Sequence, residues 1–385
     1  MGNNMVRKRT KGVKVDKPKR TRASVVEQAV EYSKEDVEPR EIIDEKDLIP
    51  SGSTLLNCAC SGNHKGAFGM GKIVTIPGGS SSGKTVLVLN VFAAVSKAKR
   101  FKDYKTIYDD AEEALAIDVA HMFNKKIARN IKPPAYDKEG NPKFSNTIQD
   151  FQNNILNLCK VGEPFIYVLD SLDSLTSTQE LEKEYKRALA VAKNPEQVKE
   201  IKGSMHTEKA KIIGHVLRMC NGAIKKSGSV LIIIQQERDK IGVVFGSKKT
   251  TSGGRAPFYY STHQIWLTKI GGIKNEGLDI GSVVKVKVAK NKLTGKRREI
   301  EFSIYDDYGI DNLSSCVDYL CECYWEKDKE KKTHWTAVEL GITGNKKGII
   351  KFVEENNLED KLDAVVGVAW NNREEAVRLQ RKRRY

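Results

Sequence analysis

A short loop rich in glycine and serine carries the residues best suited to chemistry. It follows the apolar stretch Ile73–Ile76 and precedes a helical pattern at Val86–Asn90. The loop has the spacing G-x-x-x-x-G-K-T and consists of Gly78, Gly79, Ser80, Ser81, Ser82, Gly83, Lys84 and Thr85. Backbone N–H groups in such a loop form a concave nest for phosphate, and the start of the helix adds partial positive charge. Lys84 can reach the β- and γ-phosphates and the Thr85 hydroxyl can join a magnesium shell, so the sequence predicts a nucleoside triphosphate site.

An apolar stretch that ends in an acid supports this prediction. Phe165–Leu169 leads directly into Asp170. A carboxylate at the end of a buried strand commonly holds the water shell of the magnesium ion beside a phosphate loop. Any buried strand can end in aspartate, so Asp170 is informative only in combination with the loop at 78–85. We therefore expect Thr85 and Asp170 to hold Mg²⁺.

The apolar stretches and the helical patterns between them predict an α/β fold, with a mainly parallel sheet flanked by helices. The expected strands are 73–76, 106–110, 165–169 and 230–234, and the expected helices include 145–160 and 208–227. Parallel strands place their carboxyl ends at one edge of the sheet, where we expect the site.

Other segments indicate how this core is elaborated. Alternation at 283–289 and 298–305 predicts an antiparallel hairpin, and the prolines of 132–144 predict a loop. Residues 176–207 are highly charged, which indicates a mobile, partly helical insertion. The polar segment 241–255 is too long for an idle connection, which indicates a functional loop.

Composition divides the chain into five parts. We expect a basic disordered tail at 1–24, a short amphipathic helix with a role in subunit contact at 25–48, a nucleotide-binding core at 49–312, a small α/β domain at 313–370 and a basic helical tail at 371–385. The formal net charge is +16, and basic residues are concentrated in the two tails. Such clusters favour polyanions, with nucleic acid as the first candidate, although solvated tails alone would also explain them.

The composition also argues against several classes of protein. The apolar runs are too short to span a bilayer, and no apolar segment follows the basic start of the chain, so we expect a cytoplasmic protein without membrane partners. The seven cysteines suit reduced thiols. Cys316, Cys321, Cys323 and His334 allow a zinc site on paper, but their spacing fits no standard pair of ligand motifs, so free thiols are favoured.

Taken together, several stretches resemble the RecA family of homologous-recombination ATPases. Gly78–Thr85 is similar to the phosphate loop of that family, Asp110–Leu115 to its "DAEHAL" segment, and Val168–Ser171 to its second nucleotide motif. Lys240–Gly246 with Thr250–Gly254 resembles its second DNA-binding loop, and Val288–Lys292 its "VKNK" segment. The resemblance covers roughly residues 45–355, with every motif in family order.

The resemblance implies catalytic roles for five residues. Glu112 corresponds to the base that activates the attacking water, Lys84 to the phosphate-loop lysine, and Gln236 to the residue that senses the γ-phosphate. Lys290 and Lys292 correspond to a pair that reaches the ATP of a neighbouring subunit. Because successive side chains of a strand alternate between its faces, both can point toward one anion. The cofactors implied are ATP and Mg²⁺.

The same resemblance implies contacts with single-stranded and double-stranded DNA and a helical filament of identical subunits, with single-strand-binding or loader proteins as further partners. The DNA-binding residues it implies are Arg238, Lys240, Ile241, Gly242, Val243, Thr250, Ser252, Gly253, Gly254 and Arg255, with Lys211 and Arg218 on the helix before them. The departures from the family include Gln235 in place of an asparagine, the long insertion at 176–207, and a C-terminal tail that is basic rather than acidic.

The favoured function is an ATP-dependent recombinase that polymerises on single-stranded DNA and promotes homologous pairing and strand exchange. Two alternatives stay open at this point. One is a DNA-binding filament or mediator protein that binds ATP and scarcely hydrolyses it. The other is a helicase-type or circadian-type ATPase with the same fold, which the loop at 241–254 disfavours.

Overall fold

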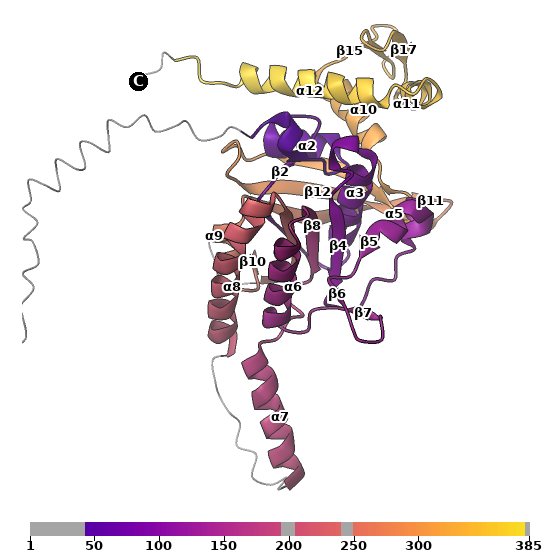
Figure 1. Cartoon of the computed structure of the whole chain (residues 1–385). Helices are drawn as coiled ribbons and strands as arrows, with labels where there is room; N and C mark the ends of the chain where they lie inside the picture. The colour runs from indigo at the N-terminus through magenta and orange to yellow at the C-terminus, as the bar shows by residue number, and fades with distance from the viewer. Residues whose placement is uncertain (1–42, 194–204, 240–248, 382–385) are drawn as a thin grey trace, which may run out of the picture. The chain divides into compact units, whose positions relative to one another are not determined.

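A ten-stranded sheet organises the part of the chain that this computed structural model describes, residues 43–193, 205–239 and 249–381 (Figure 1). Six strands run parallel in the order β11 (His263–Asn275), β3 (Ile73–Gly78), β9 (Val230–Asp239), β8 (Phe165–Asp170), β4 (Lys105–Asp110) and β5 (Ile131–Lys132). Antiparallel strands β12 (Leu278–Asn291), β13 (Glu299–Tyr305) and β14 (Gly309–Ile310) continue the sheet beyond β11, and β10 (Lys249–Thr251) pairs with β9. The predicted α/β class with a mainly parallel sheet is confirmed.

The central strands β3, β8 and β9 are mostly apolar over 73–76, 165–169 and 230–234, because helices cover both faces of the sheet there. In β9, Ile232 and Ile234 pack with the side chains of α3 (Lys84–Lys97) and α2 (Thr54–Ser61). Leu231 and Ile233 point the other way and pack with α6 (Ile148–Val161) and α8 (Met205–Ser227). This alternation follows from the two-residue period of a strand. It holds β3, β8 and β9 rigidly, with their carboxyl ends at one edge.

Smaller elements connect these layers. The short helices are η1 (Glu45–Asp47), η2 (Lys99–Phe101), α4 (Val119–Met122), α5 (Lys125–Asn130) and α9 (Ala256–Tyr260). The short strands outside the main sheet are β1 (Leu48–Ile49) with β2 (Phe68–Gly69), and β6 (Ala135–Tyr136) with β7 (Pro142–Lys143). The segment expected to be a loop at 132–144 therefore contains two paired strands, and its first residue belongs to β5.

The C-terminal part combines α10 (Asn312–Cys323), α11 (Lys346–Glu355) and α12 (Glu359–Ala376) with the three-stranded sheet β15 (Glu326–Lys327), β16 (Trp335–Ala337) and β17 (Ile342–Gly344). Its buried side chains, such as Val317 and Trp370, belong to the same hydrophobic cluster as Leu55 and Leu56 of α2. The C-terminal part therefore shares one apolar core with the ATPase-like sheet rather than enclosing a separate one.

Two expected boundaries differ from the observed elements. The expected helix 25–48 lies largely outside the described residues, and its end is a short 3₁₀ helix followed by β1. The basic helical tail expected from residue 371 begins inside α12, which ends at Ala376, and Glu374 of this helix accepts hydrogen bonds from Arg298. The expected tail 1–24 lies outside the described residues.

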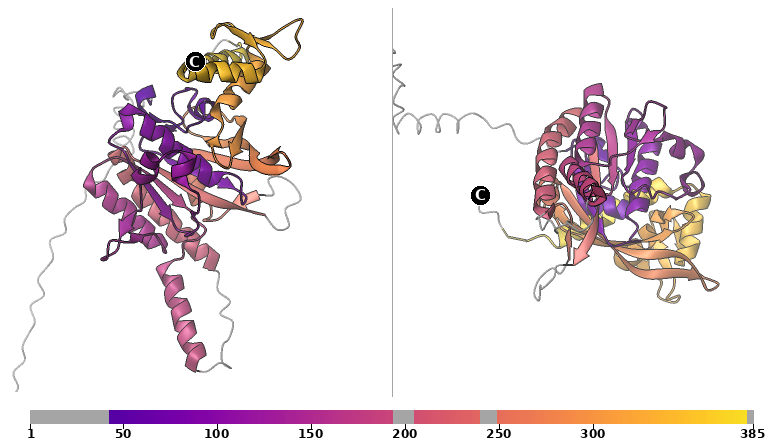
Figure 2. Two further views of the ribbon diagram at one scale, coloured as in Figure 1. Left: turned by 90° about the vertical axis from the view of Figure 1, so that its right-hand side faces the viewer. Right: turned by 90° about the horizontal axis from the view of Figure 1, so that it is seen from below.

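Within the insertion at 176–207, α7 (Thr178–Lys193) is helical and projects away from the sheet (Figure 1; Figure 2, left). Its Lys183 Nζ lies 3.0 Å from Glu208 Oε2 on α8. Residues 194–204 of the insertion lie outside the described residues. No helix in the described ranges combines the length and the apolar character needed to cross a lipid bilayer.

Candidate functional site

The predicted phosphate loop connects the end of β3 to the start of α3. Gly78 has to be glycine, because a Cβ there would lie 2.5 Å from Ser82 Oγ and 2.7 Å from the carbonyl oxygen of Leu267. Gly83 precedes the first turn of α3 with a φ of 86°, in the left-handed region that glycine adopts at little cost. These conformations direct the loop backbone toward the helix N-terminus. The loop therefore has the geometry that its sequence predicts.

Lys84 folds back over this loop. Its Nζ donates to the carbonyl oxygens of Gly78, at 3.1 Å, and Gly79, at 2.5 Å. Burial lowers the pKa of Lys84, while the nearby carboxylates of Asp170 and Glu112 oppose that shift. Ser82 Oγ is buried and has no hydrogen-bond partner among the described residues. A half-buried ammonium group and an unsatisfied hydroxyl both fit a phosphate ligand, which supplies acceptor oxygens and negative charge.

The two predicted magnesium residues are in contact. Thr85 Oγ1 donates to Asp170 Oδ2 at 2.9 Å, and Tyr108 OH donates to the same oxygen at 2.6 Å. Burial raises the pKa of Asp170, and these two hydrogen bonds act in the opposite direction. An aspartate and a threonine hydroxyl are hard oxygen ligands that suit magnesium beside phosphate. Tyr108, which orients Asp170, was not predicted from the sequence, because an aromatic residue inside an apolar strand gives no signal of such a contact.

Glu112 lies just beyond the end of β4, beside these residues. Its backbone N–H donates to the carbonyl oxygen of Asp170 at 3.1 Å. Its Oε1 accepts a hydrogen bond from Ser171 Oγ and another, of 3.1 Å, from Gln236 Nε2. The expected base, which follows β4, is therefore hydrogen-bonded to the expected γ-phosphate sensor on β9.

Asp173 is a site residue that the sequence did not reveal. It lies three residues after Asp170, and its side chain is 7% exposed. Its Oδ2 accepts a hydrogen bond of 2.9 Å from the backbone N–H of Gln236, and its Oδ1 lies 3.3 Å from Nη2 of Arg238. Lys209 Nζ of α8 donates to the Asp173 carbonyl oxygen at 3.1 Å. One residue therefore connects the end of β8 to β9 and to the start of α8.

Lys290 and Lys292 lie close together, as the hairpin pattern predicts. Lys290 Nζ donates to the carbonyl oxygens of Phe258 and Tyr259, and Lys292 Nζ donates to that of Tyr259 at 2.9 Å. Burial lowers the pKa of Lys290 to about 8, and the neighbouring charge of Lys292 adds to this shift. Within the described residues, both amines contact the end of α9 rather than the phosphate loop of their own chain.

The predicted DNA-binding residues fall in several places. Arg238 lies on β9 opposite Thr250 of β10. Ser252, Gly253, Gly254 and Arg255 connect β10 to α9, and Lys211 and Arg218 are exposed on α8. Lys240, Ile241, Gly242 and Val243 lie outside the described residues. These positions place the described part of the second loop next to Gln236.

Side-chain contacts hold the base of this loop together. Gln235 is buried, and its Nε2 donates to the carbonyl oxygen of Ser252 at 2.9 Å. Lys249 Nζ lies 3.1 Å from Glu237 Oε1 and 3.0 Å from Asp239 Oδ1. The glutamine that replaces the usual asparagine therefore joins the two ends of the loop.

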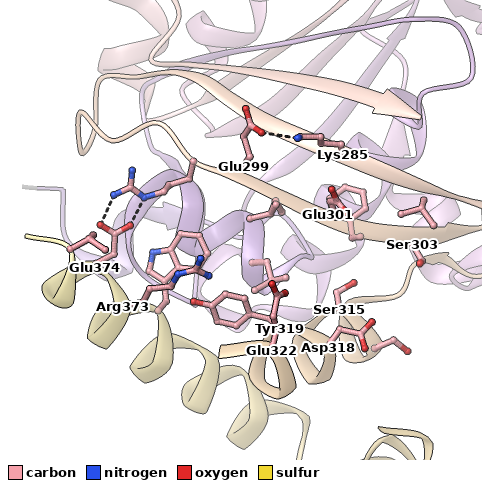
Figure 3. Close-up of a pocket in the computed structure, with 18 residues that line it drawn as sticks. Lys285, Glu299, Glu301, Ser303, Ser315, Asp318, Tyr319, Glu322, Arg373 and Glu374 are labelled. Atoms are coloured by element: carbon pink, nitrogen blue, oxygen red, sulfur yellow. Dashed lines mark hydrogen bonds and ion pairs between the residues drawn. The ribbon is translucent and has the colours of Figure 1, made fainter. Parts of the chain in front are cut away.

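A groove of about 760 Å³ lies elsewhere, between the hairpin β12–β13 and helices α10 and α12 (Figure 3). None of the predicted site residues lines it. Many of its charged groups are already paired, such as Lys285 with Glu299 and Arg298 with Glu374. Its size alone therefore does not mark it as the site of the chemistry.

The four residues named for the zinc alternative, Cys316, Cys321, Cys323 and His334, lie within the described residues. All seven cysteines are free thiols, and Cys316 is fully buried, where burial raises its pKa well above the usual value. Among the described residues, no group of three or more His, Cys, Asp and Glu side chains is arranged to hold a metal ion.

Comparison with known proteins agrees with the site. Residues 34–311 match the RecA N-terminal domain family. The chain is 31% identical to Protein RecA of Ehrlichia ruminantium over 277 residues, which are 72% of this chain and 68% of that protein. It is 28% identical to Protein RecA of Aquifex aeolicus over 336 residues, which are 86% and 87% of the two chains. With the phosphate loop, Asp170, Glu112 and Gln236 assembled at one sheet edge, these matches show that the chain belongs to the RecA family of homologous-recombination ATPases.

Proposed function

We propose that this chain, a RecA-family recombinase and DNA-dependent ATPase, hydrolyses ATP at the edge formed by β3, β4, β8 and β9 and uses it to control a filament on single-stranded DNA. The observation that carries the proposal is the contact between Gln236 and Glu112. Gln236 lies two residues before Arg238, so one strand connects the expected base to the expected DNA loop. A conformational change at either end of this strand would therefore be transmitted to the other end.

The phosphate loop would hold the triphosphate of ATP. Backbone N–H groups of the loop and the N-terminus of α3 would bind the phosphate oxygens, and Lys84 would exchange its carbonyl partners for the β/γ-phosphate charge. Thr85 and Asp170 would hold Mg²⁺, which neutralises charge on the phosphoryl group when bound. Tyr108 keeps the carboxylate of Asp170 turned toward Thr85.

Glu112 would act as the general base. A base has to accept a proton from the attacking water within hydrogen-bond reach. In this structure Glu112 Oε1 receives hydrogen bonds from Ser171 and Gln236. Gln236 would release or shift this contact when its amide donates to the γ-phosphate instead. Its position would then report the state of the nucleotide to the loop that follows β9.

Lys290 and Lys292 would complete the ATP site of a neighbouring subunit. Both amines donate to the carbonyl oxygen of Tyr259 at the end of α9, so the two cations lie close together. The lowered pKa of Lys290 reflects burial and the neighbouring charge of Lys292, and a phosphate from the next subunit would oppose both effects. Cations delivered in this way stabilise the charge on transferring phosphoryl oxygens. ATP would then lie between subunits and couple hydrolysis to filament assembly.

The DNA would lie along the second loop and the exposed face of α8. Arg238, Arg255, Lys211 and Arg218 supply phosphate contacts, and the small residues at 252–254 allow close approach of the backbone. Such contacts would hold single-stranded DNA for pairing with a duplex. Single-strand-binding or loader proteins would act on the same filament. We expect the protein to function in the cytoplasm.

The central test measures ATP turnover with and without single-stranded DNA and images the same samples by electron microscopy. We expect turnover that rises with DNA and helical filaments on the strand. Filaments with negligible turnover would favour an ATP-binding filament or mediator protein. Closed rings in place of filaments would favour a helicase-type ATPase.

A further inference from the structure

Both carboxylate oxygens of Asp173 contact residues of strand β9. Oδ2 accepts from the backbone N–H of Gln236 at 2.9 Å, and Oδ1 lies 3.3 Å from Nη2 of Arg238. The Asp173 side chain is 7% exposed, whereas that of Arg238 is 52% exposed. The acid is therefore nearly enclosed, and the guanidinium group that pairs with it is still accessible to a ligand.

An enclosed carboxylate is unstable without a positive partner. Arg238 is the cation that contacts the Asp173 carboxylate in the described residues, since the amine of Lys209 contacts the Asp173 carbonyl oxygen instead. A DNA phosphate that takes Arg238 must therefore overcome this attraction and leave Asp173 without its partner. The ion pair and the DNA contact compete for one guanidinium group.

The same carboxylate also reaches the catalytic residues. The Gln236 backbone rests on Asp173, while the Gln236 side chain donates to Glu112 at 3.1 Å. Loss of the Arg238 ion pair changes the charge beside the Gln236 backbone and removes one of the two contacts that the Asp173 side chain makes with β9. Arg238 is therefore connected to Glu112 by three consecutive contacts, through Asp173 and Gln236.

We propose that Asp173 is an internal competitor of DNA phosphate for Arg238, and that the Asp173–Arg238 pair holds the Gln236–Glu112 contact in place until DNA binds. Asp173 is a positioning residue in this scheme, because it acts through Arg238 and Gln236. The inference rests on the proposed DNA contact of Arg238. A similar arrangement at Lys249, which contacts Glu237 and Asp239, indicates that carboxylates occupy more than one cation at the base of this loop.

The test uses the full chain and a fluorescent oligothymidylate, with binding measured by anisotropy in the presence of a non-hydrolysable ATP analogue. Asp173→Asn keeps an oxygen that can accept from Gln236 but removes the charge that attracts Arg238. We expect this variant to bind DNA about two- to tenfold more tightly, the range of a partly exposed ion pair. Asp307→Asn is the matched control, because it removes one negative charge from a side chain that is 88% exposed, and it should leave affinity unchanged.

A double-mutant cycle assigns the gain to Arg238. Arg238→Ala alone should weaken binding, and Asp173→Asn should have no further effect in that background. If Arg238→Ala weakens binding while Asp173→Asn does not tighten it, the competition is wrong and the proposed DNA site still stands. If Arg238→Ala leaves binding unchanged, the proposed DNA contact of Arg238 fails, and the inference fails with it.

Measurements of ATP turnover distinguish the effect of the Asp173–Arg238 ion pair from that of the hydrogen bond between Asp173 and the Gln236 backbone. Asp173→Asn should raise turnover without DNA, because the ion pair that holds the Gln236–Glu112 contact is lost, and should reach half-maximal stimulation at a lower DNA concentration. Asp173→Ala lacks both contacts and should bind DNA more tightly with weaker stimulation, because the Gln236 backbone is no longer held. A role limited to stability would weaken binding in both variants and would overturn the proposal. Asp173→Ser retains a small acceptor for Gln236 and replaces the Asn variant if thermal melting shows that the Asn variant does not fold.

Discussion

Gln236 Nε2 donates a hydrogen bond of 3.1 Å to Glu112 Oε1, across a separation of 124 residues in the chain. Glu112 follows β4 and Gln236 lies on β9, and strand β8 lies between these two strands in the sheet. The Gln236 amide can hold the Glu112 carboxylate in place when no γ-phosphate is present. It can release that carboxylate when a γ-phosphate binds.

Glu112→Gln should retain binding of ATP and DNA, while hydrolysis falls by about 10²–10⁴, the range typical of a lost general base. The amide keeps the shape of the side chain and can still meet Ser171, so we expect an intact fold. Phosphate release at saturating DNA measures the effect, and a DNA-binding assay on the same sample serves as the control. Turnover near that of the unmodified chain would remove Glu112 from the role of base.

Lys84→Ala should abolish productive ATP binding. The Lys84 amine lies on the carbonyl oxygens of the phosphate loop, where it is placed to neutralise β/γ-phosphate charge. Titration with a fluorescent ATP analogue measures nucleotide affinity. Lys97→Ala, at the other end of α3, is a matched control that should retain affinity. Unchanged affinity in Lys84→Ala would contradict the proposed phosphate site.

Lys290→Ala combined with Lys292→Ala should leave each subunit folded, while ATP-induced filaments and turnover fall together. Both amines contact backbone carbonyl groups at the surface, so the core does not depend on them. Electron microscopy and phosphate release measure the two effects. Lys274→Ala, near the turn that connects β11 to β12, is a matched control because its side chain is 66% exposed.

Mixed filaments test whether these lysines act across the subunit interface. Subunits with Glu112→Gln keep the two lysines, and subunits with both lysines replaced keep Glu112. A mixture should regain hydrolysis, because each lysine-free site then meets lysines from a neighbour. Absence of any recovery in filaments shown to contain both variants would argue against action in trans.

Assembly should depend on pH through Lys290. Its pKa is lowered to about 8 by burial and by Lys292, so the side chain loses its charge as the pH rises through that value. A neutral amine attracts phosphate poorly, so the ATP concentration needed for assembly should increase between pH 7 and pH 9. Lys290→Arg stays charged over this range and should flatten the dependence. An equally steep profile in Lys290→Arg would assign the pH effect to another group.

Arg238→Ala combined with Lys240→Ala should make the salt dependence of single-strand binding shallower by about one to two units of log–log slope, since each phosphate contact contributes about −0.7. The basic tails also bind polyanions, so both should be removed first. The C-terminal cut belongs after Arg378, because α12 continues to Ala376. An unchanged slope in this shortened chain would place the DNA contacts elsewhere.

The central part of the fold could be predicted from the sequence because its signals are local. The apolar runs at 73–76, 165–169 and 230–234 fix the buried strands, and the loop at 78–85 marks the site between a strand and a helix. Strands β5, β6 and β7 were not predicted, because each is only two residues long and lies within or beside a proline-rich stretch. Strand β9 continues through the polar residues 235–239, where pairing with β10 extends it beyond the apolar run.

The contacts that tune the site could not be predicted, because their partners are distant in the chain. Asp173 meets Gln236 across 63 residues, and Tyr108 meets Asp170 across 62. An aspartate three residues after a strand, or a tyrosine inside one, has no distinctive pattern. The contact between Arg298 and Glu374, near the end of α12, likewise joins residues that are 76 positions apart in the chain. Only the assembled sheet brings these side chains together.

The position of β3 in the sheet has a consequence for how the chain is made. Its two neighbours are β9 and β11, which begin at Val230 and His263. While the ribosome has synthesised only the first half of the chain, the strand that carries the phosphate loop has neither neighbour. Pairing over such long sequence separations is slow and leaves apolar strands exposed in the meantime. We therefore expect the nascent chain to be unable to bind nucleotide, and to need protection from aggregation, until β11 has emerged.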